Sequence, residues 1–253
     1  MGTDAASRAR AWVHENQAAI CDVIEPWEHG TVIRATRYPD YWDYNLVRVE
    51  EEAELSAGEL VRVADRALSG LPHRRVGFEV ESAGWEAIRP DLEALGWKVS
   101  RLVWMRHDGP GPPAPGADIE QVAYDAVRHL RVEWFLEDFP DVDPKDFFEQ
   151  EREISMVRNA QVFAAFEGGA PVGFSQLERG RGAAEVTSVF VLPDHRGRGL
   201  GTALTRAAIE TGLDASDLWI VADDEGRPKE IYSRLGFRPE WKLLDCLRLP
   251  GRT

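Results

Sequence analysis

The chain has 253 residues, a hydrophobic content of 43% and a formal net charge of −14 at pH 7. This charge argues against nucleic acid and anionic membranes as partners, because both are bound through basic surfaces. No apolar run approaches the length of about 18 residues that a membrane-spanning helix needs, and the first residues lack the apolar core of a secretory signal peptide. We therefore expect a cytoplasmic globular protein, with a length that suits two domains.

The cysteine and histidine pattern predicts no structural metal. Cys21 and Cys246 lie far apart, and the six histidines form no paired spacing that is typical of metal ligands. Two distant cysteines in a chain of this kind indicate reduced thiols rather than a disulfide framework.

The first half of the chain alternates between helix and strand patterns. Its clearest signal is Ser56, followed three residues later by Glu59, which together predict a capping box at the start of a helix. The other predicted elements are a helix over 4–20, strands over 30–37, 44–50 and 76–80, a helix over 85–95 and a strand over 97–105.

A proline-rich segment separates the two halves. Residues 108–117 read DGPGPPAPGA, and four of these ten residues are prolines. Such a segment does not support a helix or a central strand, and it is typical of a linker. We therefore predict domains over 1–107 and 118–253, joined by the linker 108–117.

The second half begins with a strand and two helices, over 119–122, 124–136 and 144–157. Gly168 and Gly169 predict a hairpin turn between strands over 161–166 and 172–177. The remaining predicted elements are a strand over 185–192, a helix over 202–211, a strand over 217–222, a helix over 228–235 and a closing strand or hairpin over 237–249.

The segment Arg196-Gly197-Arg198-Gly199-Leu200-Gly201 connects a predicted strand to a predicted helix. The first N–H groups of a helix have no partner within the helix, and the helix dipole adds positive charge at this end. Glycines allow an anion to approach these N–H groups closely, while arginines offer donors that suit phosphate oxygens. The turn therefore predicts a phosphate-bearing ligand, most simply a pyrophosphate.

Three classes of pyrophosphate ligand compete for this turn. A nucleotide P-loop needs Gly-Lys-Ser/Thr, which is missing, and the glycines are too closely spaced for a dinucleotide-binding fingerprint. Arg196, Gly199 and Gly201 do match the Arg/Gln-x-x-Gly-x-Gly/Ala turn that binds coenzyme A in the GNAT superfamily (GCN-related N-acetyltransferases), which the sequence resembles here. The structural alternative is a turn that only connects a strand to a helix.

A second segment extends this resemblance over residues 118–249. IYSRLGF, residues 231–237, is similar to the GNAT segment in which a tyrosine precedes Leu-Gly-Phe. The residues LEALGW at 92–97 are similar to it. In this half, however, the helix that begins at Ser56 follows an acidic run at 50–54 rather than a glycine-rich turn. The resemblance implies a mixed α/β chain of two GNAT-like domains, of which the first is degenerate and does not bind coenzyme A.

The resemblance also implies the site residues for acetyl-CoA. Tyr232 would protonate the departing thiolate, and Glu185, eleven residues before Arg196, would be the base. Their structural alternatives are a core tyrosine and an exposed glutamate at a strand end. Glu225 stands where family members often carry an asparagine that contacts the pantetheine arm. The expected cofactor-binding residues are Val189, Val191, Arg196, Gly197, Arg198, Gly199, Leu200, Gly201 and Thr202.

The acceptor is expected to be a small-molecule amine. Asp138 and Asp141 lie in an acidic turn, where the resemblance places the acceptor entrance, and carboxylates there would attract a cation. A solvated acidic loop is the other interpretation. The function that we expect is direct transfer of an acetyl group to a primary amine in a ternary complex, by a monomer or homodimer. The alternative is a non-catalytic acyl-CoA-binding regulatory protein.

Overall fold

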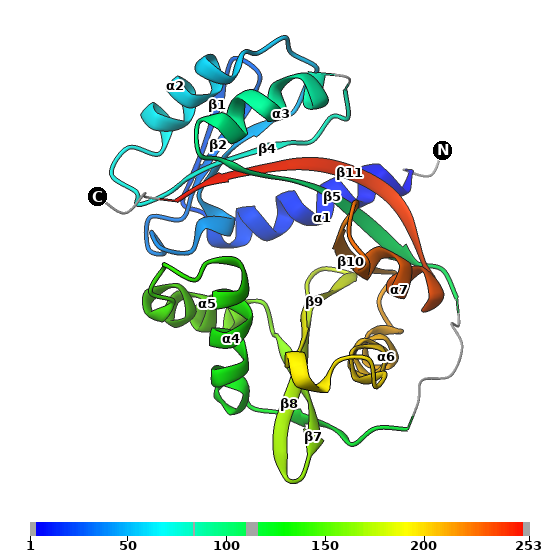
Figure 1. Ribbon diagram of the computed structural model, residues 1–253. Coiled ribbons are helices and arrows are strands. Elements are labelled where there is room, and N and C mark those ends of the chain that lie inside the picture. The colour runs from blue at the N-terminus through cyan, green and yellow to red at the C-terminus, as the bar shows by residue number, and fades with distance from the viewer. Residues whose placement is uncertain (1–3, 83, 110–115, 250–253) are drawn as a thin grey trace. The chain divides into compact units, whose positions relative to one another are not determined.

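The computed structural model describes residues 4–82, 84–109 and 116–249 (Figure 1). The chain divides into two compact units. The first comprises Met1–Val103, Ala222–Gly226 and Glu240–Thr253, and the second comprises Trp104–Val221 and Arg227–Pro239. Most of the predicted linker, residues 110–115, lies outside the described residues. The division into domains at 108–117 stays a proposal, because the first unit also includes residues from the end of the chain.

The first unit contains a mixed sheet in the order β1-β2-β3-β4-β11. The pairs β1–β2, β2–β3 and β4–β11 are antiparallel, whereas β3 and β4 are parallel. Residues 74–78 of β4 pair with residues 244–248 of β11. The strands are β1 (Val23–Trp27), β2 (Gly30–Arg34), β3 (Leu46–Val49), β4 (Arg74–Phe78) and β11 (Phe237–Arg248), of which only the part from Glu240 belongs to this unit.

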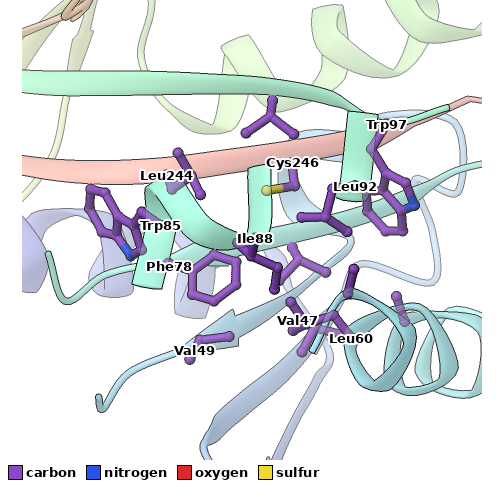
Figure 2. Close-up of a cluster of buried hydrophobic side chains, with 14 of the residues drawn as sticks. Val47, Val49, Leu60, Phe78, Trp85, Ile88, Leu92, Trp97, Leu244 and Cys246 are labelled. Carbon is purple, nitrogen blue, oxygen red and sulfur yellow. The ribbon is translucent and has the colours of Figure 1, made fainter. Parts of the chain in front are cut away.

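Three helices accompany this sheet: α1 (Ala5–Ile20), α2 (Ala57–Ala67) and α3 (Gly84–Ala94). The predicted capping box at α2 is confirmed, because the Ser56 hydroxyl accepts from the Glu59 N–H and the Glu59 carboxylate accepts from the Ser56 N–H. Helices α2 and α3 and the strands bury a common hydrophobic cluster (Figure 2). The cluster includes Val47, Val49, Leu60, Phe78, Trp85, Ile88, Leu92, Trp97, Leu244 and Cys246.

The second unit contains a sheet in the order β10-β9-β8-β7-β6. Strands β6 to β9 pair in antiparallel fashion, and β9 and β10 are parallel. The strands are β6 (Ile119–Val122), β7 (Gln161–Glu167), β8 (Ala170–Arg179), β9 (Ala183–Val191) and β10 (Asp217–Asp223). The helices are α4 (Arg128–Asp138), α5 (Lys145–Val157), α6 (Leu200–Gly212) and α7 (Pro228–Arg234). Strand β5 (Lys98–His107) crosses from the first unit into the second at Trp104.

Side chains of β8 alternate between the two faces of the second unit's sheet. Ser175 donates to the carbonyl of Leu204 in α6, over a distance of 3.0 Å. Gln176 accepts from the guanidinium of Arg131 in α4, over 2.7 Å. Successive residues of a strand point to opposite faces, so α6 and α4 cover opposite faces of this sheet, as the ribbon of this unit also shows (Figure 1). A Cβ atom on Gly173 would lie 2.8 Å from the carbonyl oxygen of Phe190, so only glycine fits there.

The mixed α/β fold class is confirmed, and one strand was missed. Strand β1 reads VIEPW, contains Pro26 and exposes three of its five residues. An edge strand of this kind shows little hydrophobic alternation, which is why its sequence carries a weak signal. No described helix is long and apolar enough to cross a membrane. Within the described ranges, no group of three or more His, Cys, Asp or Glu side chains could hold a metal ion.

Candidate functional site

The turn between β9 and α6 leaves the start of a helix open. After a short 3-10 turn at Pro193–His195, Gly197 and Gly199 adopt left-handed φ values of 79° and 82°. Gly199 is the N-cap of α6, and no side chain forms a capping hydrogen bond there. The N–H groups of the first helical turn have no acceptor within the helix. This arrangement is typical of an anion-binding site, where the ligand takes the place of a cap.

The space around the turn also suits a close approach. A Cβ atom on Gly197 would meet nothing within 4 Å, and one on Gly201 would meet only a Val191 methyl group at 3.9 Å. The side chain of Leu200, by contrast, is buried at 7% exposure. Leu200 can therefore offer a ligand only its backbone, while Thr202 is half-buried on the first turn of α6.

Both arginines of the turn are paired with carboxylates. Arg196 donates from Nε to the Val191 carbonyl over 2.8 Å and from Nη2 to Glu137 over 2.5 Å. Arg198 donates to Glu167 over 3.0 Å, and Glu167 also contacts His195 at 2.8 Å. Ion pairs between exposed side chains contribute about 0–1 kcal/mol. A polyanionic ligand can therefore replace these carboxylates, and the arginines are held at the edge of the turn where it would bind.

Strand β9 is irregular just before the turn. Thr187 pairs with Gln176 and Phe190 pairs with Phe174, so two residues of β9 stand opposite a single residue of β8. These two residues are Ser188 and Val189, and Ser188 has a φ of 51°, which is unusual for a residue other than glycine. They form a β-bulge, a feature that is common next to active sites because it redirects the backbone. The composition of this strand did not predict the bulge.

Strand β9 also extends beyond its pairing with β10. The parallel ladder joins residues 183–186 of β9 to residues 217–220 of β10, and the bulge follows directly. Val189 lies in the bulge, whereas Val191 pairs with Gly173 and its carbonyl accepts from Arg196. The backbone of Val189 is therefore the less regular of the two expected contacts.

Tyr232 lies in α7, with a side chain that is 8% exposed. Its ring packs edge-on against Phe237, with 6.3 Å between the ring centroids. Among the described residues, its hydroxyl has no hydrogen-bond partner. Burial raises the pKa of Tyr232 to about 12, because it disfavours the charged phenolate. The hydroxyl therefore stays protonated at neutral pH and can donate a hydrogen bond.

Glu185 lies on the face of the sheet that α4 and α5 cover. It stands directly opposite Glu178 of β8 in the antiparallel ladder, and residues directly opposite share a face. Glu178 accepts from the guanidinium of Arg158, which follows α5, over 3.1 Å. The half-buried Glu185 thus lies on the side of the sheet that α4 and α5 cover, and not on the side that α6 covers.

The same face holds a buried ionic network that the sequence interpretation missed. Arg131 is fully buried and contacts Glu151 at 3.2 Å, while its guanidinium lies 4.0 Å from the ring centroid of Tyr124. The Tyr124 hydroxyl in turn donates to Glu151 over 2.5 Å. One signal was available: Gln176 and Glu178 occupy alternate positions of a strand that is apolar in its first half, and buried polar side chains need partners.

The acidic turn begins at the end of α4. Asp138 is the last residue of that helix, Asp141 lies in the turn before α5, and both are exposed. The preceding residue, Glu137, contacts Arg196. The structure therefore joins the start of the acidic turn to the glycine-rich turn, while a contact between an acceptor and the two aspartates stays a prediction.

Glu225 has a partner of its own in the first unit. Its carboxylate accepts two hydrogen bonds from Arg89 of α3, over 3.0 and 3.1 Å. Arg89 also holds the pKa of Glu225 below its usual value. The Glu225 carboxylate thus forms a charge-assisted ion pair with Arg89 of α3, which a neutral asparagine at this position could not form.

Comparisons with known proteins agree with this geometry. Residues 124–237 match the model of the Acetyltransferase (GNAT) family. An uncharacterized N-acetyltransferase of Methanocaldococcus jannaschii is 40% identical over 96 residues, which cover 33% of this chain and 42% of that protein. The chain thus matches less than half the length of this relative.

Two solved structures share the fold over most of the chain. A GCN5-related N-acetyltransferase from Kribbella flavida superposes with a TM-score of 0.60 and 18% identity, over 99% of this chain and 98% of that one. A conserved protein of unknown function from Staphylococcus epidermidis gives a TM-score of 0.65 and 14% identity, over 90% and 94%. These identities support the shared fold alone. The family match shows that residues 124–237 are similar in sequence to the GNAT acetyltransferases, and the structures show that most of the chain shares their fold.

Proposed function

We propose that the second unit transfers an acetyl group from acetyl-CoA to a primary amine by direct attack in a ternary complex. The observation that carries this proposal is the uncapped start of α6, which follows two glycines with left-handed backbone. A helix start without a capping side chain is ready to bind a pyrophosphate. The match of residues 124–237 to the model of an acetyltransferase family supports the same ligand.

The turn would hold the pyrophosphate through its backbone N–H groups and its two arginines. Both guanidinium groups already lie at the turn and would exchange Glu137 and Glu167 for phosphate oxygens. Backbone groups of Val189 and Val191 would orient the pantetheine arm. The residues that we assign to the cofactor are therefore Val189, Val191, Arg196, Gly197, Arg198, Gly199, Leu200, Gly201 and Thr202.

Acetyl-CoA supplies a thioester, and the chain's residues handle the protons. The amine nitrogen forms a bond to the carbonyl carbon, the C–S bond breaks, and the sulfur leaves as a thiolate. Glu185 would take the proton from the ammonium group, directly or through water. Tyr232 would protonate the thiolate as it leaves, since its buried hydroxyl stays protonated, and would regain a proton from the nitrogen as the amide forms. Asp138 and Asp141 would attract the amine.

The test is release of free coenzyme A by the full chain from acetyl-CoA, with a panel of amines that covers polyamines, amino acids, amino sugars and peptides. We expect turnover with at least one amine and a large loss of turnover in Glu185→Gln. Glu120→Gln makes the same change on the exposed strand β6 and should leave the rate unchanged. Tight binding of acetyl-CoA without turnover of any amine would instead favour the non-catalytic, regulatory function.

We also propose that the first unit is a degenerate GNAT-like domain that does not bind coenzyme A. Its α2 has a complete capping box, and the preceding residues 50–54 include four glutamates. Both features disfavour a pyrophosphate at this helix. The protein would act in the cytoplasm as a monomer or homodimer. Size-exclusion chromatography with light scattering measures its molar mass and so distinguishes these two states.

A further inference from the structure

We propose that Glu137 is an autoinhibitory residue: it occupies Arg196 of the glycine-rich turn until the pyrophosphate of coenzyme A displaces it, and its displacement loosens the end of α4. The contact joins two residues of the second unit that are 59 positions apart in the chain, with 2.5 Å between Arg196 Nη2 and the Glu137 carboxylate. Glu137 is the next-to-last residue of α4. This inference rests on the proposed function, because it needs an anion at the turn.

Arg196 is held at the turn by contacts other than Glu137. Its Nε donates to the Val191 carbonyl over 2.8 Å, and its guanidinium carbon lies 5.5 Å from the ring centroid of Phe190. Both of these partners belong to β9, which directly precedes the turn. The side chains of Arg196 and Glu137 are 49% and 40% exposed, so an anion in solution can reach the pair. A phosphate can therefore replace the carboxylate while the guanidinium keeps its place.

The end of α4 depends on this ion pair. The last turn of the helix contains the carboxylates of Glu137 and Asp138 and no basic residue of its own. The negative end of the helix dipole lies there, so a carboxylate in this turn is unfavourable unless a cation offsets it. Among the described residues, Arg196 is the cation paired with Glu137. Once an anion takes Arg196, the hydrogen bond from the Phe139 N–H to the Phe135 carbonyl, which closes the helix, should open more often.

The second arginine of the turn provides a contrast. Arg198 donates to Glu167 over 3.0 Å, but Glu167 also contacts His195 at 2.8 Å. Glu167 ends strand β7, and strands have only a small net dipole. A phosphate that displaces Glu167 from Arg198 therefore leaves that carboxylate with a partner and disturbs no helix. The pair of Glu137 and Arg196 is thus the one that links the cofactor turn to the acidic turn after α4.

The first experiment measures the affinity of the full chain for coenzyme A by calorimetry. Glu137→Gln removes the competing carboxylate and should raise the affinity by about two- to fivefold, as expected for an exposed ion pair. Glu133→Gln is the matched control, because this exposed residue lies one turn earlier on α4 and loses the same charge. It should leave the affinity nearly unchanged. In an Arg196→Gln protein, Glu137→Gln should have no further effect. Equal affinities of wild type and Glu137→Gln, or equal gains from both glutamate variants, would overturn the proposal.

The second experiment follows amide hydrogen exchange by NMR with and without coenzyme A. In the wild type, the Asp138 and Phe139 amides should exchange about two- to fivefold faster when coenzyme A is bound, because the last turn of α4 opens more often. In Glu137→Gln they should exchange at the same rate in both states. Slower exchange at the start of α6 reports cofactor binding independently. Slower exchange there without faster exchange at Phe139 contradicts this inference alone, whereas an absence of coenzyme A binding contradicts the proposed function as well.

Discussion

The segments β3–α2 and β9–α6 have the same topology but differ at the first turn of the helix. In both units a strand leads into a helix and then pairs in parallel with the next strand. The start of α2 is closed by Ser56 and Glu59, which use each other's backbone N–H groups. The start of α6 has Gly199 and no capping side chain. The two units therefore differ in whether side chains already occupy the first N–H groups of this helix.

A second difference lies in the helix that ends before Leu-Gly-Phe or Leu-Gly-Trp. In α7 the position three residues before Leu235 is Tyr232, and in α3 the position three residues before Leu95 is Leu92. Both side chains are buried, and Leu92 belongs to the hydrophobic cluster of Figure 2. The first unit thus has an apolar residue where the second has a tyrosine hydroxyl.

Tyr232→Phe tests this second difference and has the largest expected effect. The change makes α7 resemble α3 by removing only the hydroxyl. Turnover should fall by about 10²–10⁴-fold, the usual effect of losing a general acid, while the affinity for acetyl-CoA measured by calorimetry stays nearly constant. Because burial raises the pKa of Tyr232 to about 12, the wild-type rate should show no decline due to this group between about pH 7 and pH 10. A rate within twofold of wild type would assign Tyr232 a structural role.

Gly199→Val tests the open helix start. Valine at a φ of 82° strains the backbone, and its Cβ atom blocks the approach of an anion. We expect the affinity for coenzyme A to fall by about 100-fold or more, since a bidentate or multiple contact to a charged group is lost. Gly182→Val is a matched control, because Gly182 has a φ of 79° in the β8–β9 hairpin. It should cost similar stability and leave the affinity unchanged, and equal losses in both variants would contradict the assignment.

Ser56→Ala tests the closed helix start. Loss of the N-cap hydroxyl should lower the free energy of unfolding by about 0.5–2 kcal/mol, which chemical denaturation can measure. It should not create a second coenzyme A site, because the glutamates at 50–54 remain. Calorimetry should give one bound coenzyme A per chain for both proteins, and a stoichiometry of two would refute the degenerate role of the first unit.

Asp138→Asn and Asp141→Asn test a third difference between the units. In the first unit the acidic run 50–54 directly precedes helix α2, whereas in the second unit the acidic turn follows α4. In the second unit Asp138 ends α4 and Asp141 lies in the turn before α5, after Glu137, which contacts Arg196 of the glycine-rich turn. With an acceptor identified, each change should raise the KM for the acceptor by about two- to fivefold at low salt, as expected for exposed charges. The KM for acetyl-CoA should change little, and the effect should shrink at about 0.15 M salt. An acceptor KM that is insensitive to both salt and mutation would mark the turn as a solvated loop.

Local patterns predicted much of the fold and the turn. Ser56 and Glu59, the hairpin at Gly168 and Gly169, and the glycines of the β9–α6 turn each act within a few residues, so the sequence displays them directly. Features that depend on segments far apart in the sequence were not predicted. The bulge at Ser188 arises from the register against β8, and the partners of Arg131 come from α5 and β8. Neither leaves a periodic signal in its own segment.

The pairing of β11 with β4 has a consequence for how the chain folds during synthesis. Arg75 and Asp245, which form an ion pair at 2.7 Å across this ladder, are 170 positions apart. A ribosome that adds about 5–20 residues per second therefore spends roughly ten seconds or more between making β4 and making its partner. During this time one side of β4 stays unpaired. All the strands β6 to β10 of the second unit's sheet are made within the same interval, before β11. Expression of the first half alone would leave this strand edge open permanently, which favours association with other chains.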